Sequence, residues 1–235
     1  EGTASLVLDV KFGSGAFMKE YDRAHELAET MVRLGNEAGV ATRALLTDMN
    51  VPLGLAIGNA NEVRESVEVL AGGGPADIVE LTVALAREML ELAGRPDADV
   101  EAALADGRAM DTWRAMIRAQ GGDPDAPLPT PRESHPVLAE TDGVLATQEA
   151  LPFGVAAWRL GAGRARKEDP VVHAAGIDLH KKPGDAVRAG EPLFTLHADD
   201  PARFDRALEA LDGAYTLAPA GTELPARPLV RARVA

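Results

Sequence analysis

The stretch Leu6-Val-Leu-Asp-Val-Lys-Phe-Gly-Ser-Gly-Ala-Phe-Met18 decides the fold that we expect for this chain. It opens with apolar, β-favouring residues, continues into a Gly-Ser-Gly turn and is followed by a helical pattern. This order predicts a strand, a tight loop and a helix. In parallel α/β sheets such a loop lies at the carboxyl end of a strand, where ligands usually bind. Glycines there let the backbone approach a ligand closely or adopt a positive φ.

The following segments extend this pattern into a β-α-β unit. Residues 21–38 carry apolar side chains at the spacing of one helix face, and Gly39 supplies a C-terminal stop. Residues 40–47 form a second apolar strand pattern, so the two strands should be parallel and joined by a right-handed crossover. We therefore predict the α/β class, with a parallel or mixed sheet and flanking helices. A further helix, capped by Asn59 or Asn61, is expected to run to about Leu70, and others are expected at residues 76–93, 97–106 and 109–120.

A change of composition divides the chain. Residues 121–136 hold five of the sixteen prolines and no apolar periodicity, which indicates an extended linker. Beyond it, short apolar runs alternate with Gly and Pro turns, which is typical of small strands, and one helix is expected at 204–211. The tail at 219–235 should pair at a sheet edge or cross a surface. The predicted parts are 1–120, the C-terminal part of an α/β domain; 121–136, a linker; and 137–235, a smaller β-rich domain.

Composition limits the possible functions. The chain has 235 residues, no cysteine and a net charge of -13. The lack of cysteine excludes disulfides and zinc-thiolate sites. The acidic balance disfavours nucleic acid as a partner, because phosphate-backbone binding needs a concentrated positive face. No apolar run reaches the length of a bilayer span, so no membrane partner is expected, and we expect a cytoplasmic protein.

Two long strings carry a family resemblance. Residues 8–18 and the string Ala44-Leu-Leu-Thr-Asp-Met-Asn-Val-Pro-Leu-Gly-Leu-Ala-Ile-Gly-Asn-Ala-Asn-Glu-Val-Arg-Glu65 closely resemble the pyrimidine nucleoside phosphorylases, which include the thymidine phosphorylases. The resemblance continues at lower specificity to about Ala214. It implies reversible phosphorolysis of thymidine, or of uridine or deoxyuridine, to free pyrimidine and a (deoxy)ribose 1-phosphate. Such a pentosyltransferase uses phosphate as co-substrate and no organic cofactor, and the family has a β-rich, α/β hammerhead-like C-terminal domain.

The resemblance also implies that the chain is a C-terminal portion. Glu1-Gly2 lacks an initiator methionine, and in the family this pair closes a helix with substrate contacts. The helical lobe, the phosphate loop and the Arg, Ser and Lys that grip the pyrimidine would precede it, as would the contacts of the homodimer. We therefore expect no catalytic residue in this chain, inactivity on its own, and the N-terminal remainder of the enzyme as its partner.

The resemblance places substrate contacts in the opening loop. Phe17 matches a family position that forms an apolar wall beside the pyrimidine and its C5 substituent; the alternative is that it caps the core. The other candidate substrate-binding residues are those of the turn, where a serine could instead bond its own backbone: Gly13, Ser14 and Gly15. On the preceding strand, Lys11 could face phosphate or pair with Asp9, which shares its face.

The second string implies a bound monovalent cation such as potassium. In the family, the matching ligands are the backbone carbonyls of Leu53 and Ala56 and the carboxylate of Glu65. Oxygen donors of this kind suit a hard cation. Other family ligands come from the phosphate-loop region that would precede Glu1. Spacing alone does not reveal this site, because a glutamate on a helix is usually a solvated charge.

An alternative function class stays open. The segment at 178–196 resembles the repeated turns of biotinyl and lipoyl carrier domains, so a non-catalytic binding or carrier module modified at Lys181 or Lys182 is the alternative. No Met-Lys-Met is present, and a related β fold used only as structure explains the same pattern. The histidines lack partners at metal-ligand or triad spacing and are interpreted as structural or solvated: His25, His135, His173, His180 and His197.

Overall fold

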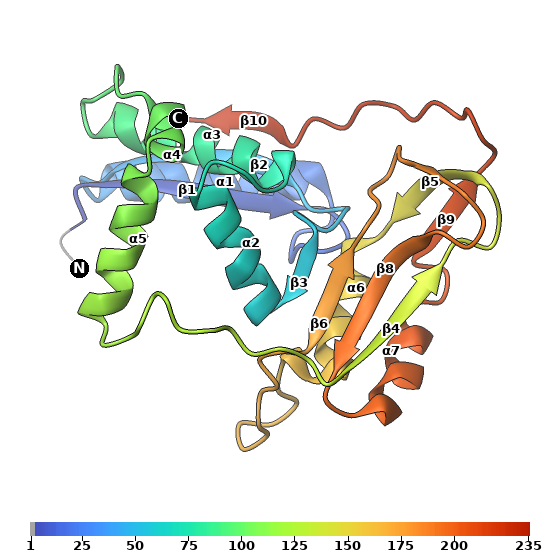
Figure 1. Cartoon of the computed structure of the whole chain (residues 1–235). Coiled ribbons are helices and arrows are strands. Elements are labelled where there is room, and N and C mark those ends of the chain that lie inside the picture. The colour runs from blue at the N-terminus through green and yellow to red at the C-terminus, as the bar shows by residue number, and fades with distance from the viewer. Residues whose placement is uncertain (1–2) are drawn as a thin grey trace. The chain divides into compact units, whose positions relative to one another are not determined.

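The structure is a computed structural model that describes residues 3–235, so the Glu1-Gly2 pair lies outside the described residues. The chain forms two compact units (Figure 1). The first contains the described residues up to Met49, with Glu68–Pro124 and Arg227–Ala235. The second contains Asn50–Val67 and Asp125–Ala226. Residues 50–67 precede the predicted linker at 121–136 but belong to the second unit. Residues 227–235 follow that linker but belong to the first unit.

The first unit is built on a mixed sheet. Strand β1 (Ser5–Phe12) pairs in parallel with β2 (Ala41–Asp48), and helix α1 (Tyr21–Glu37) connects them. Strand β10 (Val230–Val234) pairs antiparallel with the other side of β2, which gives the order β1-β2-β10 (Figure 1). The α/β class, the β-α-β unit and the pairing of the tail at a sheet edge are confirmed.

Helices cover this sheet as their apolar periodicity predicts. Ala24, Ala28 and Val32 recur every four residues along α1 and are buried against the sheet. Helix α3 (Ala76–Leu92) contacts β1 and β2 and packs its Val83 with residues of the next helix. The remaining helices of this unit are α4 (Val100–Ala105) and α5 (Arg108–Ala119).

The second unit is β-rich. One antiparallel sheet has the order β3-β6-β8-β4 and another the order β7-β5-β9. Their bounds are β3 (Ala56–Gly58), β4 (Glu133–Leu138), β5 (Gly143–Gln148), β6 (Gly176–Leu179), β7 (Ala186–Val187), β8 (Pro192–Ala198) and β9 (Tyr215–Ala218). The helical elements are α2 (Ala60–Leu70), α6 (Ala150–Ala157), the π-helical turn η1 (Trp158–Ala162), the 3-10 turn η2 (Pro201–Arg203) and α7 (Phe204–Leu211). The core includes the rings of Phe153 and Phe194, whose centroids lie 5.1 Å apart edge to face.

Proline explains two differences from the predicted elements. Helix α6 replaces an expected turn because Pro152 occupies its first turn, where a missing N–H breaks no helical hydrogen bond. Strand β4 begins within the stretch predicted as a linker and includes Pro136. A proline is tolerated there because β4 lies at the edge of its sheet.

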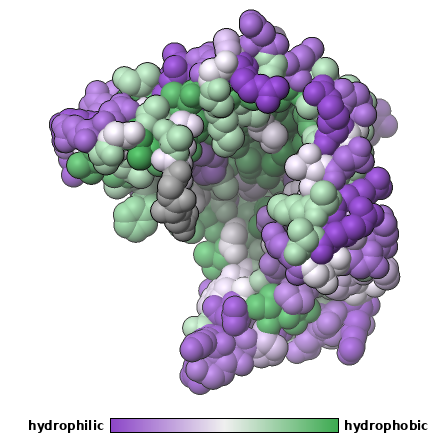
Figure 2. Space-filling view, turned by 90° about the vertical axis from the view of Figure 1, so that its left-hand side faces the viewer, coloured by the Kyte–Doolittle hydropathy of each residue, from purple (hydrophilic) through white to green (hydrophobic). Residues whose placement is uncertain are grey.

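Polar residues cover most of the face drawn in Figure 2, with hydrophobic residues in smaller areas between them. Phe17 stands out among the large hydrophobic side chains because it is 95% exposed. Within residues 3–235, the helices are too short or too polar for any of them to cross a bilayer.

Candidate functional site

The opening loop turns back on the end of its own strand. The N–H of Gly13 donates to the carbonyl of Met18 at 3.1 Å, and the N–H of Ala16 donates to the carbonyl of Gly13 at 3.0 Å. Gly13 has a φ of 113°, a conformation that side-chain-bearing residues rarely adopt. The N–H of Gly15 also donates to the carbonyl of Met49 at 2.9 Å, just after β2. The loop therefore lies at the carboxyl ends of the two parallel strands, as predicted.

The loop presents Phe17 to solvent. This side chain is 95% exposed, whereas Phe12 is 6% exposed in the core of the same unit. The alternative that Phe17 caps the core is therefore wrong. The Lys19 ammonium donates to the carbonyls of Ser14 and Ala16, at 2.7 and 2.8 Å, and so fixes the backbone on which Phe17 stands. A fixed loop with an exposed aromatic ring offers an apolar surface for a ligand.

The Lys11 ammonium pairs internally. Its Nζ lies 2.7 Å from Oδ2 of Asp9, and the hydroxyl of Thr47 donates to Oδ1 of the same carboxylate at 2.5 Å. Thr47 is fully buried on β2. The two open alternatives for Lys11 are thereby decided in favour of pairing with Asp9. Thr47, which the sequence did not single out, completes this cross-strand group.

The residues of the predicted cation site lie together in the second unit. The carboxylate of Glu65 accepts a hydrogen bond of 2.7 Å from the N–H of Leu55, which lies between Leu53 and Ala56 in the chain. The carbonyl of Leu55 accepts from the N–H of Leu179 at 2.7 Å. Glu65 is therefore engaged with the loop backbone instead of being only a solvated charge.

The donor chemistry of this loop fits a monovalent cation. The Lys182 ammonium donates to the carbonyl of Gly54 at 2.9 Å and also to the carbonyl of Pro52. Loop carbonyls on both sides of Leu53 thus already face a monovalent positive group. In the described part of the chain, no three His, Cys, Asp or Glu side chains gather as metal ligands. A site here would depend on backbone carbonyls with Glu65, the donor set that suits potassium better than a transition metal.

Both lysines of the carrier-like segment 178–196 lie in the turn between β6 and β7 and have polar partners. The Lys181 ammonium lies 2.7 Å from the carboxylate of Glu191 and donates to the carbonyl of Ala186 at 3.2 Å. Lys182 donates to Pro52 and Gly54, as described above.

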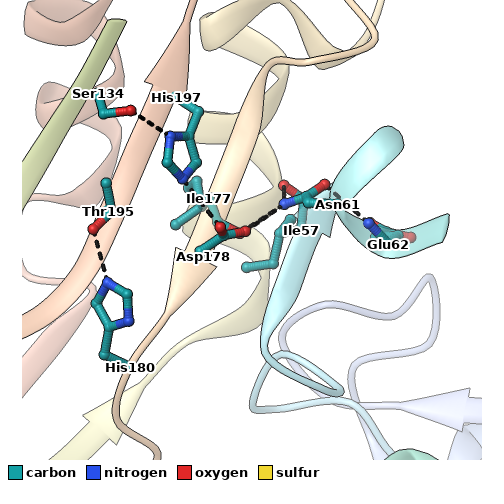
Figure 3. Close-up of polar contacts among 9 residues, drawn as sticks. All are labelled: Ile57, Asn61, Glu62, Ser134, Ile177, Asp178, His180, Thr195 and His197. Atoms are coloured by element: carbon teal, nitrogen blue, oxygen red, sulfur yellow. Dashed lines mark hydrogen bonds and ion pairs between the residues drawn. The ribbon is translucent and has the colours of Figure 1, made fainter. Parts of the chain in front are cut away.

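A chain of polar side chains connects α2 to the sheet of the second unit (Figure 3). The amide of Asn61 donates to Oδ1 of Asp178 at 3.0 Å and to the carbonyl of Ile177 at 3.1 Å. Nε2 of His197 lies 3.1 Å from Oδ2 of Asp178, and the Ser134 hydroxyl lies 2.8 Å from Nδ1 of the same ring. Four side chains from four elements thus form one hydrogen-bonded series.

Two glycines make room for the Asn61 amide. A Cβ atom at Gly58 would lie 2.6 Å from Oδ1 of Asn61, and one at Gly176 would lie 2.9 Å from its Nδ2. Contacts this short do not occur between real Cβ atoms and their neighbours. The beginning of α2 is therefore seated closely against β3 and β6.

Asp178 is the centre of this series. Burial raises the pKa of this carboxyl, but hydrogen bonds from His197 and Asn61 outweigh that effect and hold the pKa below its ordinary value. Its two oxygens accept from different partners, so the carboxylate links Asn61 of α2 to His197 of β8. The sequence did not reveal this group because its members lie far apart in the chain. Strand alternation could have found it only once the register was known.

Three further histidines make local contacts that agree with a structural or solvated role. Nε2 of His180 lies 2.7 Å from the Thr195 hydroxyl (Figure 3), and Nδ1 of His25 lies 3.6 Å from the carboxylate of Glu29. The ring of His135 lies 5.5 Å from that of Phe204.

Two families match the two parts of the chain. Residues 1–115 match the family described as "Glycosyl transferase family, a/b domain". Residues 144–218 match the family described as "Pyrimidine nucleoside phosphorylase C-terminal domain". The first range contains the opening loop and the residues of the predicted cation site, and the second contains Lys182, Asp178 and His197.

Relatives match the chain along most or all of its length. It is 52% identical over 234 residues to a protein named "Thymidine phosphorylase" from Mycobacterium tuberculosis. The aligned residues make up 100% of this chain and 54% of the relative. It is 45% identical to a "Pyrimidine-nucleoside phosphorylase" from Bacillus subtilis, over 84% of this chain and 48% of the relative. The protein of the same name from Staphylococcus aureus is 41% identical, over 92% of this chain and 52% of the relative. The chain thus spans about half the length of these relatives.

Proposed function

Because the chain belongs to the pyrimidine nucleoside phosphorylase family, we propose that it forms part of an enzyme for the reversible phosphorolysis of thymidine, and of uridine or deoxyuridine. The observation that carries this proposal is the match to a thymidine phosphorylase over the whole chain, at 52% identity. The products would be the free pyrimidine and the corresponding pentose 1-phosphate. Inorganic phosphate would be the co-substrate.

The reaction exchanges one bond at the anomeric carbon of the sugar. A phosphate oxygen forms a bond to C1′ while the bond from C1′ to the base nitrogen breaks, and the bonding pair leaves with the base, which takes up a proton. The transition state has oxocarbenium character. An enzyme mainly has to place the phosphate dianion and stabilise the charge that arrives on the departing base.

The opening loop would supply one wall of the base site. Phe17 would pack against the pyrimidine ring and its C5 substituent, a role that its 95% exposure supports. The backbone of Gly13, Ser14 and Gly15 would approach the same ligand. These groups contribute shape and orientation, since an aromatic ring offers no proton to the leaving base.

The loop at 50–59 would hold a potassium ion. The carbonyls of Leu53 and Ala56 and the carboxylate of Glu65 would be its ligands in this chain. When bound, the ion would supply a fixed positive charge that keeps the loop ordered. The contact of Glu65 with the N–H of Leu55 supports this assignment, because it brings the carboxylate to the loop backbone.

The remaining groups of the active site would come from outside this chain. The chain spans about half the length of its relatives, and the family resemblance assigns the phosphate loop and the Arg, Ser and Lys that grip the pyrimidine to the part outside it. Its partners would be the N-terminal remainder of the same enzyme and, in the intact protein, a second subunit of a homodimer. The chain by itself would therefore be inactive.

A chimera tests this proposal. This chain would replace the matching 234 residues of the Mycobacterium tuberculosis relative, and thymine release from thymidine would be followed with and without phosphate. We expect phosphate-dependent release by the chimera and none by the chain alone. Phosphate-dependent release by the pure chain would contradict the assignment of a partial site. A folded chimera without activity would contradict the proposed function.

A further inference from the structure

Lys182 contacts the proposed cation loop although it is not one of the proposed ligands. Its ammonium donates to the carbonyl of Gly54 at 2.9 Å and to the carbonyl of Pro52. These carbonyls belong to the residues on either side of Leu53, whose own carbonyl is a proposed potassium ligand. The contact joins positions that lie about 130 residues apart in the chain.

The turn between β6 and β7 holds Lys182 in place. The N–H of Lys182 donates to Oδ2 of Asp185 at 2.7 Å, and the N–H of Asp185 donates back to the carbonyl of Lys182 at 3.0 Å. Gly184 has a φ of 103°, which glycine adopts easily, and its N–H donates to the carbonyl of Leu145 at 2.8 Å. The backbone of Lys182 is therefore fixed by a tight turn that is tied to β5.

The loop depends on such a donor. Pro52 and Gly54 are buried, and buried carbonyls are nearly always hydrogen-bonded. Hydrogen bonds from an ammonium group are stronger than those between neutral groups. Lys182 holds the Pro52–Leu53 and Gly54–Leu55 peptide units, which flank the Leu53–Gly54 peptide, and so restricts the rotation of the Leu53 carbonyl. Glu65 and Leu179 hold the next residue, Leu55, by its N–H and its carbonyl.

We propose that Lys182 is a positioning residue of the cation site, which fixes the Pro52 and Gly54 carbonyls and so sets the Leu53 carbonyl for potassium. This inference rests on the proposed function, since it assigns the residue to the cation site of that enzyme. The role also accounts for Lys182 in the carrier-like segment 178–196, because its side chain reaches the loop at 50–59. The charge of the Glu65 carboxylate offsets the repulsion between the Lys182 ammonium and a potassium ion.

Hydrogen exchange tests the positioning role without potassium or activity. The variants are Lys182→Met and Lys182→Gln, which remove the charge, and the matched control is Lys181→Met in the neighbouring residue. In both Lys182 variants we expect the amides at 53–56 to exchange about tenfold faster, and in Lys181→Met within about twofold of the parent chain. The amides of β8 serve as a reference for folding. Unchanged exchange at 53–56 in both Lys182 variants would overturn the proposal.

Potassium binding tests the consequence for the site. The rise of the unfolding temperature with potassium is measured in the chimera at constant ionic strength, with tetramethylammonium as the replaced ion. We expect the half-saturating potassium concentration to rise about tenfold in Lys182→Met and to stay within about twofold in Lys181→Met. A parent-like value in both Lys182 variants would overturn the role in cation binding. Absence of any potassium effect in the parent chimera would refute the cation part of the proposed function, while hydrogen exchange would still decide the role of Lys182.

Discussion

The side-chain amide of Asn61 donates a hydrogen bond of 3.0 Å to the carboxylate of Asp178, which ties the first turn of α2 to β6. The same helix carries Glu65, whose carboxylate reaches the N–H of Leu55. The position of a proposed potassium ligand is thus coupled to an anchor one helical turn away. This anchor can be tested separately from the ligand.

Replacing Asn61 should destabilise the second unit. We expect Asn61→Ala to lower the free energy of unfolding by about 1–2 kcal/mol, because it removes a hydrogen bond to a charged, half-buried carboxylate. Urea unfolding measures this change. The control is Glu68→Ala, an exposed position of the same helix, which should shift stability by no more than ~0.5 kcal/mol. Equal effects of the two variants would argue against the anchor.

The contribution of Asp178 should depend on pH. Its folded pKa lies below the ordinary value of 3.8, so folding favours the ionised form. The stabilisation is fully present above the unfolded pKa and is lost as the pH falls through the lower folded pKa. The difference in unfolding free energy between the parent chain and Asp178→Asn should therefore shrink as the pH falls from about 6 to about 3. A difference that stays constant over this range would show that ionisation of Asp178 does not contribute.

The buried hydroxyl of Thr47 should matter for the first unit. It donates to Oδ1 of Asp9, and its removal would leave that oxygen without this partner inside the sheet. We expect Thr47→Val to lower the free energy of unfolding by about 1–3 kcal/mol. The matched control is Thr82→Val on the exposed side of α3, with an expected change within ~0.5 kcal/mol. If denaturant midpoints of both variants coincide with that of the parent, the cross-strand group is not stabilising.

Phe17 should affect substrate binding but not stability. Because the side chain is 95% exposed, Phe17→Ala should change the free energy of unfolding by less than ~0.5 kcal/mol. Phe12→Ala, in the core, should lower it by about 3–5 kcal/mol. In the chimera, Phe17→Ala should raise KM for thymidine about tenfold with little change in kcat, since a wall of the base site binds ground state and transition state alike. An unchanged KM would remove Phe17 from the site.

Local patterns predicted the elements but not the contacts between distant segments. The apolar spacing of Ala24, Leu27, Ala28 and Met31 predicted α1 correctly, but Leu34, which the same pattern assigned to the buried face, is 58% exposed. The three residues of β3 carry too little periodicity to be recognised, and they form a strand only because β6 pairs with them. Pro152 indicated a turn because a sequence does not show whether a proline begins a helix or interrupts one.

In the candidate site, too, local patterns could be predicted from the sequence and contacts between distant segments could not. The glycines of the opening loop indicated a turn after β1, and the structure has that loop. The sequence pattern alone did not distinguish an exposed Phe17 from one that caps the core. The hydrogen bonds of Lys182 to Pro52 and Gly54 leave no local signal, because the partners are about 130 residues apart. Side-chain contacts of this kind become visible only when the topology and register are known.

The decisive measurement is combined phosphorus and proton NMR of the chimera with thymidine and inorganic phosphate. Both products are followed together, so that bond formation to phosphate is seen and not inferred. We expect one equivalent of 2-deoxyribose 1-phosphate for each thymine released, and the reverse reaction when the products are supplied. Thymine released with free deoxyribose and no loss of phosphate would show a hydrolase, and would contradict the assignment.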